Sequence, residues 1–149
     1  MDLRPETILD IGIGNGKWGC LCYEYLHYWR NVTPIIDGIE IFGNYKSPAY
    51  GFYREVFYDS VLKKLDILKN YDLVMAFDII EHLTREEGLN MLGKIEKHYL
   101  ISTPSYWNPQ GASFGNKYEI HISKWTESDF ANSMLITDAT GRQQILGWK

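Results

Sequence analysis

The chain has 149 residues, of which 45% are hydrophobic and 23% charged, and its formal net charge is −4. A globular chain of this length buries roughly 68–70% of the surface that its unfolded form exposes, so one core can form without disulfides or metal. The composition excludes disordered, collagen-like and disulfide-scaffold proteins. The acidic balance, with a pI of about 5.5, argues against general nucleic-acid binding.

Cysteine usage and hydropathy indicate a cellular compartment. Cys20 and Cys22 lie two residues apart, which is too close to staple a loop and too few for a cysteine zinc site, so we interpret them as reduced thiols. No apolar run reaches the roughly 18 residues of a membrane helix, and the first residues lack the features of a signal peptide. We therefore expect a cytoplasmic protein that does not bind membranes.

Short apolar runs rich in Ile, Leu and Val alternate with stretches of helical spacing. Such runs are typical of strands that are buried on both faces of a parallel sheet. The five runs cover residues 7–13, 34–41, 55–58, 71–77 and 99–103.

Three helices are predicted between these strands. The second is expected over residues 60–69, and the third begins with a capping box formed by Thr84 and Glu87. The third helix should carry Leu89, Leu92 and Ile95 on one side. The first helix follows Gly16 and has an apolar stripe that we expect to face the core, made of Trp18, Leu21, Cys22, Tyr25, Tyr28 and Trp29.

The C-terminal part departs from this alternation. After a short helix around residues 126–131, two apolar segments, 134–137 and 144–148, flank a glycine-containing turn at 138–142 and predict an antiparallel hairpin. The fold class is therefore α/β, a Rossmann-like, doubly wound and mostly parallel sheet with a C-terminal hairpin. Nothing marks a boundary, so we expect a single domain over residues 1–149.

The strongest local signal is the run Asp10-Ile11-Gly12-Ile13-Gly14-Asn15-Gly16 at the end of the first strand. Glycines let the chain turn sharply and let a ligand approach the main chain, with the N–H groups of the following helix facing it. Gly14, Gly16 and Gly19 also match the Gly-x-Gly-x-x-Gly pattern of dinucleotide-binding proteins. A turn that serves only tight packing is the alternative.

An acidic residue, Glu40, ends the second strand, 24 residues beyond Gly16. A carboxylate has two acceptor oxygens and so matches the two neighbouring hydroxyls of a ribose. The alternative is a strand-end glutamate that forms a salt bridge or faces solvent. Together the glycine run and Glu40 predict an adenosine-containing ligand.

Four elements, in order, resemble the class I S-adenosylmethionine-dependent methyltransferases. They are Asp10-x-Gly12-x-Gly14-x-Gly16, Glu40, the run 71–83 and the run 100–104. The resemblance covers nearly the whole chain and implies S-adenosylmethionine as cofactor and the strand order 3-2-1-4-5-7-6. The implied cofactor-binding residues are Asp10, Gly12, Gly14 and Gly16 at the methionine part, Glu40 at the ribose, Asp59 and Ser60 near the adenine, and also Ile41 and Asp78.

Two alternatives to these assignments remain. Asp59 and Ser60 also match a helix N-cap. A nicotinamide-dependent oxidoreductase shares the glycine pattern, but the acid before the glycines and the run 78–82 belong to the methyltransferase pattern, and no Tyr-x-x-x-Lys pair is present. We therefore favour the methyltransferase.

Asp78, Glu81 and His82 stand at i, i+3 and i+4, which would place them on one helical face. With His121 they resemble the Glu-x-x-Glu-His and distant histidine that hold a divalent metal in small-RNA 2′-O-methyltransferases and some quinone-pathway O-methyltransferases. Glu81, His82 and His121 are the candidate metal ligands. We favour the interpretation without metal, in which Asp78 contacts the cofactor while Glu81 and His82 brace the next helix.

The sequence thus predicts methyl transfer from S-adenosylmethionine to an oxygen, nitrogen or carbon atom of a small molecule, with His82 and His121 as candidate bases. The long segment 105–124 should wall the acceptor pocket with Tyr106, Trp107, Phe114 and Tyr118. One alternative is a cofactor-binding module that needs a partner or is inactive. Another is a metal-assisted RNA 2′-O-methyltransferase, against which the acidic charge counts. A homodimer or a partner protein is left open.

Overall fold

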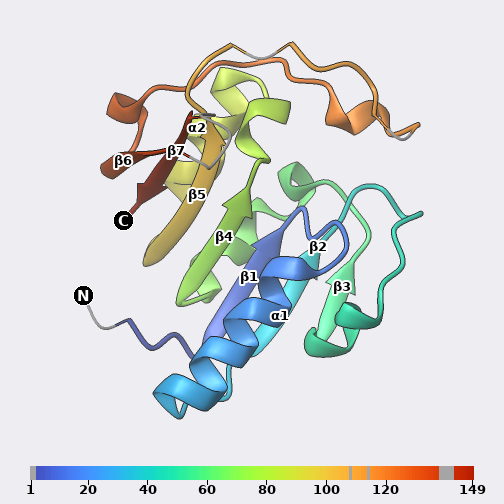
Figure 1. Ribbon diagram of the computed structural model, residues 1–149, viewed down its shortest axis with the longest axis vertical. Coiled ribbons are helices and arrows are strands. Elements are labelled where there is room, and N and C mark those ends of the chain that lie inside the picture. The colour runs from blue at the N-terminus through green and yellow to red at the C-terminus, as the bar shows by residue number, and fades with distance from the viewer. Residues whose placement is uncertain (1–2, 108, 114, 138–142) are drawn as a thin grey trace. The chain divides into compact units, whose positions relative to one another are not determined.

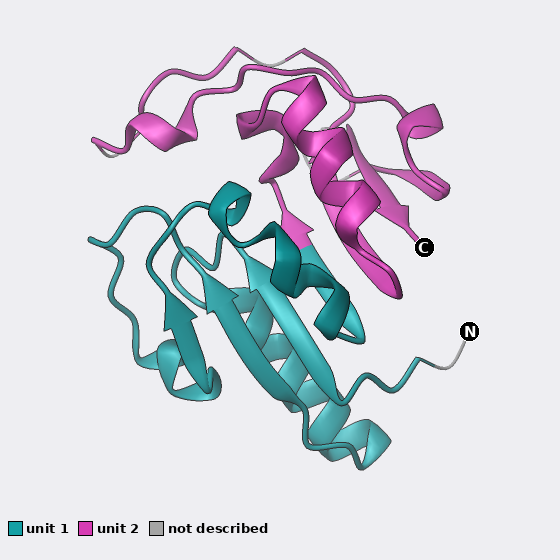
Figure 2. Ribbon diagram, turned by 180° about the vertical axis from the view of Figure 1, so that it is seen from behind, with its two compact units in different colours: residues 1–75 teal, residues 76–149 magenta. Residues whose placement is uncertain are grey.

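The structure is a computed structural model that describes residues 3–107, 109–113, 115–137 and 143–149. Its seven strands form a sheet in the order β3-β2-β1-β4-β5-β7-β6, which confirms the predicted order (Figure 1). The chain divides into two compact units, residues 1–75 and 76–149, which are described separately (Figure 2). The single-domain assignment stays a prediction.

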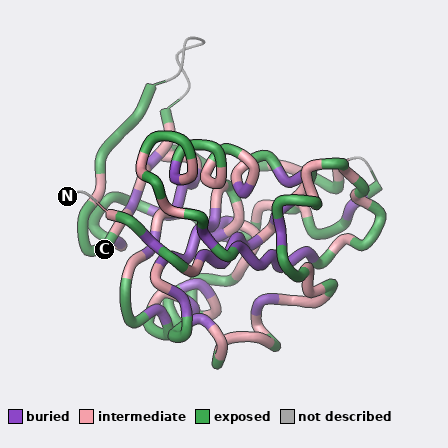
Figure 3. Tube along the Cα trace, turned by 90° about the horizontal axis from the view of Figure 1, so that it is seen from below, coloured by how far each residue is buried: buried purple, intermediate pink, exposed green. Residues whose placement is uncertain are grey.

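The first unit contains three parallel strands, β1 (Thr7–Ile11), β2 (Ile35–Ile39) and β3 (Glu55–Phe57). All three fall within the predicted runs. β4 (Leu73–Phe77) begins in this unit. Most residues of β1, β2 and β4 are buried (purple in Figure 3). Branched side chains with few rotamers fill such a core at low entropic cost.

The first predicted helix is present, but it buries a different face from the one expected. α1 (Lys17–Glu24) lies over β1 and β2 and continues into the π-helical turn η1 (Tyr25–Trp29) (Figure 1). The prediction that the apolar stripe faces the core was wrong, because four of its members are 45–77% exposed, namely Leu21, Tyr25, Tyr28 and Trp29. The helix buries Gly19 and Leu26 instead. Gly19 has no side chain, so this face can approach its neighbours more closely than the aromatic face could.

The predicted helix over residues 60–69 is replaced by two short 3₁₀ helices, η3 (Val61–Lys63) and η4 (Leu65–Asn70). Lys64 separates them with a backbone φ of −119° and ψ of 13°, which no regular helix can continue through. A further 3₁₀ helix, η2 (Pro48–Phe52), precedes β3 and was not predicted.

The second unit contains β5 (His98–Pro104), β6 (Asn132–Thr137) and β7 (Gln143–Trp148). β7 pairs antiparallel with both β5 and β6, so the predicted C-terminal hairpin is confirmed. Its expected turn at residues 138–142 lies outside the described residues.

α2 (Arg85–Lys94) begins at the predicted capping box. Thr84 Oγ1 accepts a hydrogen bond from the Glu87 N–H at 3.2 Å, and the Glu87 carboxylate accepts one from the Thr84 N–H at 2.8 Å. Ile95 is buried as expected, but Leu89 is 48% exposed. The fully buried Trp125 packs against Gly88, which turns the Gly88 and Met91 side of α2 inward.

Three short 3₁₀ helices complete the second unit: η5 (Ile80–His82), η6 (Lys117–Glu119) and η7 (Glu127–Asp129). η7 takes the place of the predicted helix around residues 126–131. A membrane-spanning helix is not found among the described residues, where every helix is too short or too polar.

Candidate functional site

The glycine run forms a tight turn between β1 and α1. Gly12, Gly14 and Gly16 have φ values of 70°, 51° and 78°, in the left-handed region that residues with a Cβ rarely adopt. A Cβ built on Gly14 would meet no atom of the described chain within 4 Å. The N-cap of α1 is Gly16, and no described side chain caps the helix, so its first N–H groups are suited to an anionic ligand group.

Glu40 follows β2 and braces this turn. Its Oε2 accepts a hydrogen bond from the Gly14 N–H at 2.9 Å, and its Oε1 accepts one from the Phe42 N–H at 2.7 Å. The side chain is buried, so the alternative of a solvent-facing glutamate was wrong. A carboxylate can accept about four hydrogen bonds, so two backbone bonds orient Glu40 without exhausting it. The neighbouring Ile41 is 38% exposed.

Asp10, at the end of β1, is 1% exposed. Its Oδ2 accepts a hydrogen bond from the Tyr53 hydroxyl at 2.6 Å, whereas its Oδ1 has no hydrogen-bond partner within the described residues. Burial raises the pKa of Asp10 to about 6. The group is therefore largely ionised at neutral pH, and one of its oxygens lacks a donor.

Asp59 and Ser60 have structural bonds of their own. Asp59 Oδ1 accepts from the Ser60 N–H at 2.8 Å and pairs with Lys63 Nζ at 3.0 Å, and the Lys63 bond lowers the pKa of Asp59. Ser60 caps η3 through a bond from the Leu62 N–H. The N-cap alternative is thus correct for Ser60, and the adenine contact of both residues stays a prediction.

Asp78 lies in the second unit directly after β4, and its φ of 55° is rare for a residue with a side chain. Its Oδ1 accepts hydrogen bonds from Ser102 Oγ and Gln144 Nε2, each at 3.0 Å. Because the backbone is left-handed at Asp78, this residue does not continue the turn of η5. The cofactor contact predicted for Asp78 stays a prediction.

Glu81, His82 and His121 do come together in the second unit. Each offers one ligand atom, and these atoms all lie within 4.8 Å of one another. Asp78 is not part of this group of described residues. The prediction that Asp78, Glu81 and His82 share one helical face is therefore not confirmed. The Ile122 and Ser123 N–H groups donate to the Glu81 carbonyl at 2.9 and 3.1 Å, which holds the segment after His121 beside η5.

The electrostatics of this group are unusual. Glu81 is 3% exposed, and neither carboxylate oxygen has a hydrogen-bond partner among the described residues. Burial raises the pKa of Glu81 to about 8 and lowers that of His82. His82 Nδ1 lies 3.1 Å from the Ile120 carbonyl oxygen, so Nδ1–H donates to it and Nε2 is the nitrogen left to act as a base or a ligand. The rings of His82 and His121 lie 4.9 Å apart.

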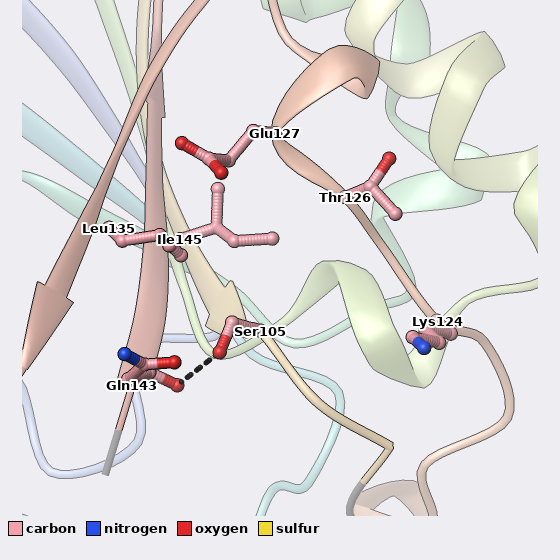
Figure 4. Close-up of a pocket in the computed structure, with 7 residues that line it drawn as sticks. All are labelled: Ser105, Lys124, Thr126, Glu127, Leu135, Gln143 and Ile145. Carbon is pink, nitrogen blue, oxygen red and sulfur yellow. Dashed lines mark hydrogen bonds between the residues drawn. The ribbon is translucent and has the colours of Figure 1, made fainter. Parts of the chain in front are cut away.

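The segment 105–124 contributes its ends to a cavity of about 250 Å³ in the second unit (Figure 4). The cavity is lined by Ser105, Lys124, Thr126, Glu127, Leu135, Gln143 and Ile145. Tyr106, Trp107 and Tyr118 do not line it and are 41–47% exposed, so they do not form the expected wall here. Phe114 lies outside the described residues.

Sequence reasoning missed two tyrosines that contact the predicted cofactor site. Tyr53 bonds Asp10, and the Tyr50 hydroxyl donates to the Gly14 carbonyl at 2.6 Å. Both come from the stretch between β2 and β3, where nothing in the spacing indicates which of several aromatic residues turns inward.

Comparison with solved structures identifies the fold. The 1,6-didemethyltoxoflavin-N1-methyltransferase of Burkholderia thailandensis, solved with 1,6-didemethyltoxoflavin and S-adenosylhomocysteine, matches 97% of this chain with a TM-score of 0.63 and 14% identity. The chain has the class I methyltransferase fold. It spans 70% of that enzyme and 51% of an O-methyltransferase family protein from the same organism, which matches 97% of this chain with a TM-score of 0.58 and 13% identity.

A third similar structure is the small RNA methyltransferase HEN1, which matches 99% of this chain with a TM-score of 0.60 and 15% identity. This chain spans 23% of it. No protein-family model and no curated protein sequence matches the chain.

Proposed function

We propose that this chain is a methyltransferase that binds S-adenosylmethionine and transfers its methyl group to a small molecule. The arrangement of Glu40 carries this proposal. Its carboxylate is held against the glycine turn by the Gly14 N–H, where it can accept the hydroxyls of a ribose. The glycine turn that Glu40 contacts has space beside its main chain, and the helix after it has no side-chain cap. Both features are expected of a ligand site and are not needed for a glutamate that only stabilises the fold.

The residues of the first unit fit the other parts of the cofactor. The unpartnered Oδ1 of Asp10 would accept from the ammonium group, and the N-terminus of α1 would bind the carboxylate. Gly14 leaves room beside the main chain, and Ile41 offers an apolar surface to the adenine. Asp59 and Ser60 remain proposed contacts of this unit, and the cofactor contact of Asp78, a residue of the second unit, remains a prediction from the sequence.

Bound S-adenosylmethionine supplies an electrophilic methyl group, so the chain has only to align the acceptor and manage its proton. Burial lowers the pKa of His82, which keeps its imidazole neutral at pH 7, with Nδ1–H fixed on Ile120. Nε2 of His82 can then accept the proton of the acceptor, and His121 is the second candidate base. His82→Ala should lower turnover roughly 100-fold or more if His82 is this base.

A small-molecule acceptor is supported by the acidic net charge of −4 and by the 1,6-didemethyltoxoflavin bound in the Burkholderia enzyme. RNA would need a basic surface to neutralise its phosphates. The unpaired thiols of Cys20 and Cys22 support a cytoplasmic location.

A second candidate function is metal-assisted methyl transfer, which is favoured by the Glu81 carboxylate, whose oxygens have no hydrogen-bond partner in the described part of the chain. Glu81, His82 and His121 fit a divalent ion, because their ligand atoms converge and two imidazoles and a carboxylate suit first-row metals. Such an ion would supply a positive charge that lowers the pKa of an acceptor hydroxyl. Turnover that is abolished by a chelator and restored by Mn²⁺ would support it, and chelator-insensitive turnover would exclude it.

Calorimetric titration of the full chain with S-adenosylhomocysteine, and in parallel with NAD, tests the proposal. We expect saturable binding of S-adenosylhomocysteine alone. Glu40→Gln should weaken it by roughly 1–3 kcal/mol, whereas Glu55→Gln, on the exposed side of β3, should not. Binding of NAD alone would favour the oxidoreductase. Binding of S-adenosylhomocysteine without turnover on any acceptor would favour a module that needs a partner.

A further inference from the structure

We propose that Tyr53 is a positioning residue for cofactor binding, whose hydroxyl holds the Asp10 carboxylate so that its second oxygen can accept from the cofactor's ammonium group. This inference rests on the proposed function.

The Tyr53 hydroxyl is fixed from two sides. It donates to Asp10 Oδ2 at 2.6 Å and accepts from the Gly19 N–H of α1 at 3.1 Å. The side chain is 8% exposed, so little water competes for either bond. Because a phenol has one hydrogen to donate and Tyr53 gives it to Asp10, the hydroxyl determines which oxygen of this carboxylate is occupied.

Two glycines make room for the Tyr53 ring. A Cβ on Gly19 would overlap the hydroxyl end of the ring, and a Cβ on Gly38 in β2 would lie 3.0 Å from its Cδ1. Glycine inside a helix or strand is destabilising relative to alanine. The chain has this disadvantage at both positions. Gly19 accommodates the Tyr53 ring alone, whereas Gly38 accommodates Ile13, whose Cγ2 would lie 2.7 Å from an added Cβ, as well as the Tyr53 ring.

The other oxygen of Asp10 lacks a donor. Oδ1 is buried and has no partner in the described part of the chain. The titratable groups that face Asp10 are Tyr53, Glu40 and Cys22, and none of them carries a positive charge. A buried carboxylate in such surroundings favours a cationic ligand, and the ammonium group of the cofactor is of that class.

The Tyr53 bond also sets the pH range in which Asp10 is charged. Burial raises the pKa of Asp10 to about 6, and the bond from Tyr53 works in the opposite direction. Burial and the charge of Asp10 raise the pKa of Tyr53 far above neutral, so Tyr53 remains a donor throughout. Cofactor affinity should therefore fall as the pH drops through about 6, and loss of the hydroxyl should move this midpoint upward.

The experiment is a calorimetric titration of S-adenosylhomocysteine into the full chain at several pH values between about 5 and 8. Tyr53→Phe should raise the midpoint by about one pH unit and weaken binding at pH 7 roughly three- to tenfold. Tyr71→Phe is the matched control, because Tyr71 is a second buried tyrosine of the same unit and donates to Asp37 at 2.7 Å. Its midpoint should equal that of the unmodified chain.

The outcomes separate this inference from the proposed function. If the unmodified chain does not bind S-adenosylhomocysteine at any pH, the proposed function is wrong. If it binds and folded Tyr53→Phe has an unchanged midpoint, Tyr53 is only structural and the inference is overturned. Should Tyr53→Phe not fold, Gly19→Ala displaces the hydroxyl while keeping the phenol, and an unchanged midpoint there overturns it equally.

Discussion

Asp10 in the first unit and Glu81 in the second are both buried carboxylates, and they differ in their hydrogen-bond partners and in how far burial raises their pKa. Asp10, in residues 1–75, receives a hydrogen bond from Tyr53, and burial raises its pKa to about 6. Glu81, in residues 76–149, has no partner for either oxygen among the described residues, and burial raises its pKa to about 8. At neutral pH the first is mostly ionised and the second mostly protonated.

The two acids differ in how far hydrogen bonds offset the cost of burial. Desolvation acts on both groups in the same direction, since it disfavours the charged form. The phenol of Tyr53 and the backbone of Gly19 offset part of it at Asp10, which therefore stays mostly ionised at neutral pH. Because its pKa is about 8, Glu81 would ionise at neutral pH only with a cation bound beside it. Without such a cation its carboxyl group stays mostly protonated.

The largest expected effect is on the pH dependence of stability. Glu81 has a folded pKa of about 8 against an ordinary value of 4.5. Between these values the unfolded state loses its proton first, so this group makes stability fall as the pH rises, by on the order of 4 kcal/mol between pH 5 and pH 8. Glu81→Gln should remove this decline, as measured by urea unfolding at both pH values. A decline that persists unchanged in the variant would show that Glu81 is ionised in the folded chain.

The next effect concerns the first carboxylate. Asp10→Asn should weaken binding of S-adenosylhomocysteine at pH 7 by about 1.5–3 kcal/mol, because an amide replaces the charged acceptor. It should also abolish the pH dependence of binding between about pH 5 and pH 7. Asp66→Asn, in the 3₁₀ helix η4, is a control that should do neither. Equal affinities of Asp10→Asn and the unmodified chain would mean that the Asp10 carboxylate does not bind the cofactor.

The smallest effect separates stability from electrostatics. Thr84→Ala removes the capping box of α2 and should destabilise the chain by about 1 kcal/mol at every pH. The difference in unfolding free energy between pH 5 and pH 8 should stay the same as in the unmodified chain. A changed pH dependence would mean that the α2 cap, rather than burial, sets the pKa of Glu81.

The sequence predicted the parts of the fold that depend on local chemistry. The glycine turn needs φ values that other residues avoid, and the capping box of Thr84 and Glu87 satisfies its own helix end, so both could be recognised without the rest of the chain. The strand order followed from resemblance, and the hairpin from two apolar runs.

The errors arose where packing decides between faces. An aromatic stripe on α1 looked like a core face, yet Gly19 packs inward and Trp29 is 77% exposed. A hydrophobic pattern cannot show that a missing side chain makes the closest contact. Asp78 was expected to share a face with Glu81, but its left-handed backbone breaks the helical spacing.

The sequence identified several residues of the candidate site but not the hydrogen bonds that connect them. Glu40, Asp10 and the glycines were identified, whereas Tyr53 was missed because its contact to Asp10 spans 43 residues of sequence. Long-range pairs of this kind depend on how strands align, and one sequence does not reveal that.

The most direct test of the account is a crystal structure of the full chain grown with S-adenosylhomocysteine. We predict that the ribose hydroxyls lie within hydrogen-bond distance of the Glu40 carboxylate and that the ammonium group lies at Asp10 Oδ1. A bound ligand that contacts neither carboxylate, or crystals that stay without ligand at saturating concentration, would contradict the proposed cofactor site.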